Sequence, residues 1–178
     1  MKSVRIAVLF AILSVSATAS RAELDGKSFS SKEWRVSLEA PDYWNATDKT
    51  AYPNILLRLY RRAPDGKMLL AVEKVKRDTK AVDYAVATAE RLNSMGFQTR
   101  APQLHTATGA YLVDAQSRTA FLRQAYLVSG GVAYSLTLAA TDSRTRSSHL
   151  RAFERTLKQI KVTKETKAKQ VSGNRVVP

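Results

Sequence analysis

Two turn sequences, each set between two runs of strand-forming residues, constrain the fold of this chain most strongly. The turns are Pro64-Asp65-Gly66 and Ser129-Gly130-Gly131. In the first turn proline presets φ and glycine accepts a positive φ, and in the second the two glycines permit a tight reversal. The turns join residues 55–62 to 67–75, and residues 119–128 to 132–141. Each pair of runs therefore predicts a β-hairpin, and hairpins build antiparallel sheet.

Two further segments have the apolar period of amphipathic helices. In residues 81–95 apolar side chains recur every three or four positions, with Asp78 or Thr79 in front as an N-cap and Gly96 behind as a left-handed terminator. Residues 147–161 carry Leu150, Phe153, Leu157 and Ile160 along one side. Additional strands are expected at residues 34–38, 97–104 and 110–116. Because the helices alternate with hairpins rather than with single strands, the sequence predicts an α+β fold with two main helices packed on a largely antiparallel sheet.

The first nineteen residues have the pattern of a secretory signal peptide. Lys2 and Arg5 precede an apolar run at residues 6–15, which is followed by Ala17-Thr18-Ala19. We expect cleavage after Ala19 and a periplasmic or secreted product. The apolar run is roughly half of the ~20 residues that a membrane span requires, so we expect no transmembrane anchor after cleavage.

The remaining chain is predicted to hold one domain between two polar segments. Residues 20–28 are polar and lack periodicity, and we expect a flexible leader. A single domain is expected over residues 29–162. Residues 163–178 have no apolar periodicity and are predicted to be a disordered basic tail.

Cysteine content and charge limit the classes of function. The chain contains no cysteine, which excludes disulfides, thiolate metal sites and cysteine nucleophiles. Its formal net charge is +14, of which Lys2 and Arg5 supply two, so the mature chain carries +12. Ten basic and two acidic residues follow Asp142, so +8 of this charge lies at the C-terminal end. Such asymmetry indicates either an anionic partner outside the cytoplasm or a solubilising surface.

Two groups of basic residues are candidate binding surfaces. At 100° per residue, Arg151, Arg155 and Lys158 share one side of the second helix, about 150° from its apolar side, and Lys161 follows them. The second group is expected to combine Arg58, Tyr60 and Arg62 on one strand with Lys74 and Lys76 on its hairpin partner. Arginine stems that merely cover an apolar layer are the alternative interpretation of the second group.

The sequence shows no set of residues that specifies a reaction. It lacks the G-x-S-x-G, S-x-x-K and H-E-x-x-H signatures of hydrolases, and neither His105 nor His149 has ligand partners at metal-site spacing. Folding could still bring together acids and a histidine; the candidates are Glu39, Glu73, Asp114 and His105. We predict a protein that is not an enzyme and binds no metal or cofactor.

Residues 34–44 carry a resemblance to a known superfamily. The segment Trp34-Arg35-Val36-Ser37-Leu38-Glu39-Ala40-Pro41-Asp42-Tyr43-Trp44 resembles the entry of the Mog1/PsbP-like superfamily, a strand followed by proline, two residues and tryptophan. The order of hairpins and helices over residues 29–162 is also similar to that superfamily. The resemblance implies an α/β/α sandwich around an antiparallel sheet that serves as a noncatalytic binding or assembly module. It implies no site residues, because the superfamily has no shared catalytic motif.

Together these observations lead to one functional expectation and one alternative. We expect an exported noncatalytic binding or assembly factor that supports an envelope protein complex, or contacts an anionic envelope surface, through the basic helix and tail. The alternative is a periplasmic binder of a small amphiphilic or anionic ligand in a sandwich cleft lined by Trp44, Tyr60 and Tyr126. The export signal argues against a nucleic-acid partner. Oligomeric state does not follow from the sequence.

Overall fold

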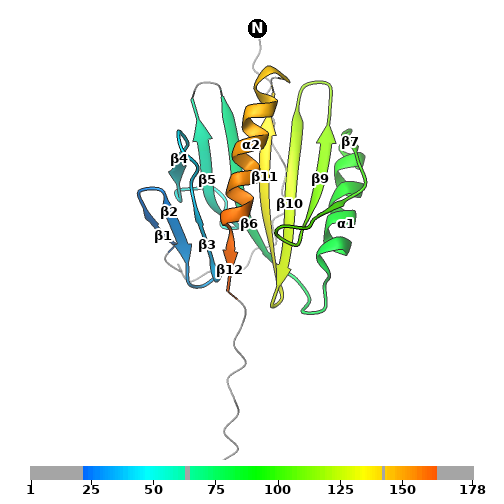
Figure 1. The fold of residues 1–178 in the computed structure, drawn as a ribbon. Helices are drawn as coiled ribbons and strands as arrows, with labels where there is room; N and C mark the ends of the chain where they lie inside the picture. The colour runs from blue at the N-terminus through cyan, green and yellow to red at the C-terminus, as the bar shows by residue number, and fades with distance from the viewer. Residues whose placement is uncertain (1–21, 63–64, 142, 164–178) are drawn as a thin grey trace, which may run out of the picture.

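Two antiparallel sheets and two helices make up the part of the chain that the computed structural model describes, residues 22–62, 65–141 and 143–163 (Figure 1). Sheet B has eight strands and sheet A has four. The predicted signal peptide and almost all of the predicted basic tail lie outside the described residues. Among the residues within them, no helix is long and apolar enough to cross a membrane.

Sheet A is built mainly by the N-terminal part of the domain. Its strands, in spatial order, are β1 (Ala22–Asp25), β2 (Ser28–Ser31), β3 (Val36–Glu39) and β12 (Lys161–Val162). The prediction of a flexible leader is therefore wrong from residue 22 onward. Leu24 of β1 pairs with Phe29 of β2, and Phe29 is buried in the core, so packing of an apolar face orders this hairpin. Gly26 takes a positive φ of 56° at the turn.

Sheet B contains both predicted hairpins, β5–β6 and β10–β11, and their prediction is confirmed. Its strands, in spatial order, are β4 (Asn45–Thr47), β5 (Ile55–Arg61), β6 (Gly66–Lys74), β11 (Val132–Ala140), β10 (Phe121–Ser129), β9 (Ala110–Gln116) and β7 (Gln98–Thr99). The strand predicted at 97–104 is divided into β7 and β8 (Gln103–His105), both paired with β9. Pro102 lies between them and has no N–H for a continuous ladder.

The two helices cover opposite faces of sheet B. Helix α1 (Ala81–Ser94) packs on β9 and β10, whereas α2 (Ser143–Gln159) packs on β11 and β3. The predicted helix at 81–95 is confirmed, and Gly96 has the expected positive φ of 86°. The predicted cap is wrong, because Lys80 is the N-cap residue and its side chain makes no capping bond. Helix α2 begins four residues before the predicted position.

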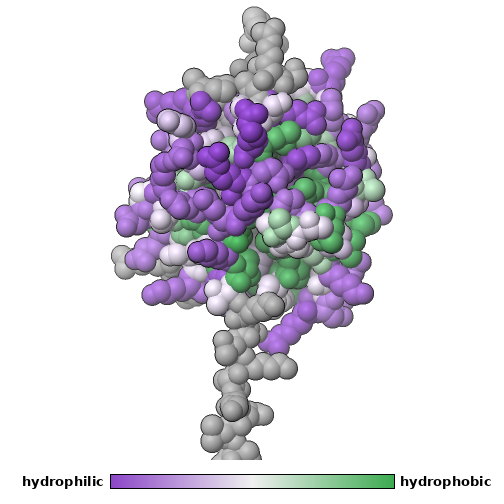
Figure 2. Space-filling model, viewed as in Figure 1, coloured by the Kyte–Doolittle hydropathy of each residue, from purple (hydrophilic) through white to green (hydrophobic). Residues whose placement is uncertain are grey.

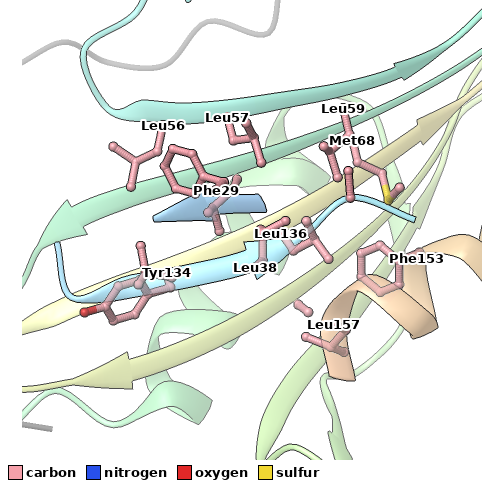
Figure 3. Packing of buried hydrophobic residues seen from close by; sticks show 14 of the residues in the cluster. Phe29, Leu38, Leu56, Leu57, Leu59, Met68, Tyr134, Leu136, Phe153 and Leu157 are labelled. Carbon is pink, nitrogen blue, oxygen red and sulfur yellow. The ribbon is translucent and has the colours of Figure 1, made fainter. Parts of the chain in front are cut away.

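The larger apolar cluster fills the space between sheet A, α2 and one face of sheet B (Figure 3). Phe153 and Leu157 of α2 point toward Leu38 of β3 and Leu136 of β11. A smaller cluster lies under α1, where Ala85, Ala89 and Leu92 meet the other face of sheet B. The α+β prediction is confirmed in these layers, but sheet A as a second sheet was not foreseen.

Candidate binding surface

A basic ridge runs along the outward side of α2. Arg151, Arg155 and Lys158 are exposed, while Phe153 and Leu157 on the opposite side of the helix are buried. Lys161 of β12 is also exposed, just beyond the helix. Figure 2 shows hydrophilic side chains, in purple, along the middle of the face where Figure 1 places α2. The predicted exposure of these four residues is confirmed, and we call Arg151, Arg155 and Lys158 the basic ridge.

Asp42 is the acidic neighbour of the ridge, but its main partner is another lysine. Lys27 Nζ lies 2.9 Å from Asp42 Oδ1, whereas Arg155 Nη1 lies 4.0 Å from Asp42 Oδ2. The hydrogen bond and charge of Lys27, and more weakly the charge of Arg155, hold the pKa of the Asp42 carboxyl below its ordinary value. The Arg155 side chain is 63% exposed, so its charge remains available to a partner.

The single acid of α2, Glu154, is directed away from the ridge into a charged network. Arg123 of β10 donates from Nε and Nη2 to both carboxylate oxygens of Asp114 at 2.7 Å, and from Nη1 to Glu154 Oε1 at 3.3 Å. His105 Nε2 lies 3.1 Å from Glu154 Oε2. The hydrogen bond to Asp114 is the main cause that raises the pKa of Arg123. Because Glu154 is used in this way, α2 itself contributes only positive charge to the ridge, and Asp42 is the acidic group beside it.

Folding thus joins two of the four residues considered for catalysis. His105 and Asp114 belong to one network, through Glu154 and Arg123. His105 Nδ1 also lies 2.8 Å from Thr108 Oγ1, which gives the order hydroxyl, imidazole, carboxylate. Each carboxylate here is compensated by Arg123, however, and the contacts tie α2 to β8, β9 and β10. Such charged hydrogen bonds hold the helix against the sheet, and we call them a clamp.

The other two acids lie elsewhere. Glu73 accepts a hydrogen bond from the Tyr84 hydroxyl of α1, on the opposite face of sheet B. Glu39 is exposed on β3 of sheet A. Among the described residues, no three histidine, aspartate or glutamate side chains are placed to hold a metal ion.

The second predicted basic surface does not form as expected. Arg58 and Tyr60 share a face of β5, with the guanidinium carbon 5.4 Å from the ring centroid, but this face is opposite to the one that α2 covers. Lys67 pairs with Tyr60, whereas Lys74 is an odd number of residues further along β6 and points to the other face. Arg62 follows the end of β5 in the turn, and Lys76 lies beyond the end of β6. The nine predicted surface residues therefore belong to separate regions.

The aromatic residues expected to line a ligand cleft are also separated. Trp44 is buried in the core, edge-on to His149 at 5.6 Å between ring centroids. Tyr126 is buried under α1 and donates a hydrogen bond to Gln124 Oε1. Tyr60 lies on the open face of β5. The alternative prediction of a ligand pocket lined by these three residues is wrong.

The structure does contain a cleft, which sequence reasoning missed. It has a volume of about 750 Å³ and lies on the outer face of sheet A beside the C-terminal end of α2. Its lining consists of Glu23, Asp25, Ser28, Phe29, Ser30, Ser37, Leu38, Glu39, Lys158, Gln159 and Lys161. Lys158 thus belongs both to the basic ridge and to this cleft. The signal that could have located the cleft is the alternation of polar residues in β1 to β3.

The fold resembles solved structures, although no protein-family model and no curated protein matches the sequence. The cyanobacterial PsbP protein CyanoP of Synechocystis sp. PCC 6803 superposes with a TM-score of 0.55 and 12% identity, over 84% of this chain and 99% of that one. LpqN of Mycobacterium tuberculosis, a protein involved in cell envelope biogenesis, superposes with a TM-score of 0.54 and 16% identity. The match covers 72% of this chain and 83% of LpqN. A protein of Bacteroides thetaiotaomicron superposes with a TM-score of 0.55 and 12% identity, over 80% of this chain and half of that one. The chain has the PsbP-like fold.

Proposed function

We propose that this protein is an exported, noncatalytic binding protein that docks an acidic surface of a cell-envelope protein complex through the basic ridge. The observation that carries the proposal is the separation of charge on α2. Arg151, Arg155 and Lys158 face solvent, while the single acid of the helix is held by Arg123 and His105. A surface of one sign on a rigid helix attracts and orients a partner of the opposite sign.

The export pattern at the N-terminus and the fold support the same role. Residues 1–19 have the sequence of an export signal, which limits the partners to those outside the cytoplasm. LpqN, with a similar fold, is involved in cell envelope biogenesis. Four further basic residues follow residue 163 in the sequence, Lys164, Lys167, Lys169 and Arg175, and they add positive charge to this end of the chain.

The test compares partner capture by two triple variants from detergent-solubilised native envelope. Arg151→Gln, Arg155→Gln and Lys158→Gln together remove the basic ridge. We expect at least a tenfold loss of the captured acidic complex, which corresponds to about 1.4 kcal/mol of binding free energy. Capture by the unchanged protein should also fall as salt rises from about 0.05 to 0.5 M, because salt screens exposed charges.

The matched control removes three exposed charges outside the ridge, by Arg58→Gln, Lys67→Gln and Lys76→Gln. It changes net charge equally and should keep the partner. Equal loss in both triple variants would mean that net charge alone is responsible. Full capture by the ridge variant would contradict the docking proposal directly.

A further inference from the structure

The cleft on sheet A has two walls of opposite charge. Glu23 and Asp25 of β1 form the acidic wall, and Lys158 of α2 with Lys161 of β12 form the lysine wall, while Glu39 of β3 lies on the floor between them. We propose that this cleft binds a short peptide with both ends free, its amino group at the acidic wall and its carboxylate at the lysine wall. This site is distinct from the proposed docking function, although Lys158 takes part in both.

The strand register sets the distance between the walls. Glu23 pairs with Ser30, Ser30 with Ser37, and Ser37 with Lys161, so these four residues form one row across sheet A. The row spans three strand spacings of ~4.8 Å, or about 14 Å. An extended peptide advances ~3.4 Å per residue, so about four residues bridge the walls. The register therefore selects a peptide of roughly three to five residues.

The floor between the walls carries groups suited to a peptide backbone. Ser28, Ser30 and Ser37 offer hydroxyls that can donate or accept hydrogen bonds. Gln159 also lines the cleft, and its side-chain amide is a group that can both donate and accept hydrogen bonds. These side chains are therefore suited to the N–H and C=O groups of a peptide.

The charged side chains of the two walls differ from other acids of the protein in having no ion-pair partner among the described residues. Asp42, Asp114 and Glu154 all form ion pairs. None of the five charged residues of the cleft forms an ion pair with a described residue. The cleft is therefore negative at β1, where Glu23 and Asp25 lie, and positive at α2 and β12, where Lys158 and Lys161 lie, with Glu39 of β3 between the two walls. An anionic ligand would meet repulsion at the acidic wall and a cationic ligand at the lysine wall, whereas a zwitterion satisfies both.

The volume of the cleft agrees with a ligand of this size. At about 750 Å³ it falls within the roughly 300–1,000 Å³ of small-molecule sites. The lining mixes polar and apolar surface in similar shares, with charged side chains at both walls, so charge and hydrogen bonds would orient the ligand. We therefore expect binding that depends on both ends of the peptide.

The experiment titrates the isotopically labelled mature protein with tetraalanine and follows the amide signals by NMR. Three probes are compared: tetraalanine with free ends, its N-acetyl form and its C-terminal amide. We expect the free peptide to shift signals of β1 to β3 and to bind at least fivefold more tightly than either blocked form. Absence of binding at a peptide concentration of about 10 mM, which corresponds to a binding free energy weaker than roughly −3 kcal/mol, would overturn the proposal. Equal affinity for all three probes would do so as well.

Two double variants establish the orientation. In the Glu23→Gln, Asp25→Asn variant, N-acetylation of the peptide should no longer lower its affinity, while C-terminal amidation should still do so. In the Lys158→Gln, Lys161→Gln variant, C-terminal amidation of the peptide should no longer lower its affinity, while N-acetylation should still do so. The opposite pairing of variants and probes would overturn the assignment of the walls. All these positions are exposed, so the variants should keep the fold, which the NMR spectrum itself reports.

A third variant separates the cleft from the docking function. Arg151→Gln with Arg155→Gln changes ridge residues that do not line the cleft. It should bind tetraalanine with unchanged affinity even where it captures less of the envelope complex. A parallel loss of peptide binding in this variant would contradict a site confined to the cleft.

Discussion

Gly66 lies against the edge of the His149 ring, so that a Cβ built on residue 66 would stand only 2.7 Å from His149 Nε2. The same Cβ would lie 2.9 Å from Cη2 of Trp44. Gly66 does not have a positive φ. The prediction that residue 66 is glycine because the turn requires a positive φ is therefore wrong. Residue 66 must be glycine because the rings of His149 and Trp44 leave no room for a Cβ. His149 Nε2 donates a hydrogen bond to the Asp65 carbonyl at 2.7 Å, which holds the ring over this glycine.

Gly66→Ala should destabilise the protein by overpacking. His149 is fully buried and Trp44 is 4% exposed, so neither ring can move aside without disturbing the core. We expect a loss of about 1–3 kcal/mol in the free energy of unfolding, measured by chemical denaturation. In a His149→Ala background the same substitution should cost clearly less, because the closest neighbour is gone. An equal cost in both backgrounds would assign the effect to the backbone.

The bidentate contact between Arg123 and Asp114 should contribute measurably to stability. Both side chains are about four-fifths buried, and Asp114 accepts two hydrogen bonds of 2.7 Å. Asp114→Asn should lower the free energy of unfolding by roughly 1–3 kcal/mol, since a hydrogen bond to a charged group is lost in a largely buried site. Asp42→Asn, at an exposed ion pair, is the control and should change stability much less. Similar effects of the two substitutions would refute a clamp role for the Arg123 network.

The tyrosines under α1 should make stability fall at alkaline pH. Burial raises the pKa of Tyr126 well above its ordinary value; burial, followed by the hydrogen bond to Glu73, does the same for Tyr84. A raised pKa in the folded state means that this stabilisation is complete below the unfolded pKa of about 10 and is lost as pH rises toward the folded value. Between those values each such group steepens the decline by up to about 1.4 kcal/mol per pH unit.

Tyr126→Phe provides the matched comparison. It removes the hydrogen bond to Gln124 at every pH, so it lowers stability by a constant amount. The titration of Tyr126 is therefore reported only by the change, above pH ~10, in the difference between the unfolding free energies of the variant and the unchanged protein. We expect a shallower decline in the variant, measured by denaturation at a series of pH values with absorbance of tyrosinate as the second readout. Parallel pH profiles would show that Tyr126 ionises as in the unfolded chain.

Local periodicity predicted the long elements well. The 3.6-residue period of α1 and the turns of the β5–β6 and β10–β11 hairpins are properties of neighbouring residues, so they survive without tertiary information. The β1–β2 hairpin was missed because its strands have four residues each and a polar composition. Its signal is nevertheless present, in the alternation of Ala22–Asp25 and in the Asp25-Gly26 turn.

The two candidate surfaces show the same difference between local and tertiary information. Arg151, Arg155 and Lys158 were placed correctly because one helix determines their common side. Lys74 was placed on the wrong face because the hairpin register, in which Arg61 pairs with Gly66, decides which residues of β6 lie beside Tyr60. A β-bulge between Ile55 and Leu57 also places Ile55 opposite Ala71, on the other face of β5 from Leu57 and Leu59.

The sequence by itself determined the elements with a strong local period, the export pattern and the basic side of α2. Tertiary structure alone decided which distant groups meet: His149 over Gly66, Glu154 on Arg123, and the acidic wall opposite Lys158 and Lys161. The physical reason is that a hydrophobic period depends on residues a few positions apart. A contact across layers depends on strand register and packing, which the whole core settles together.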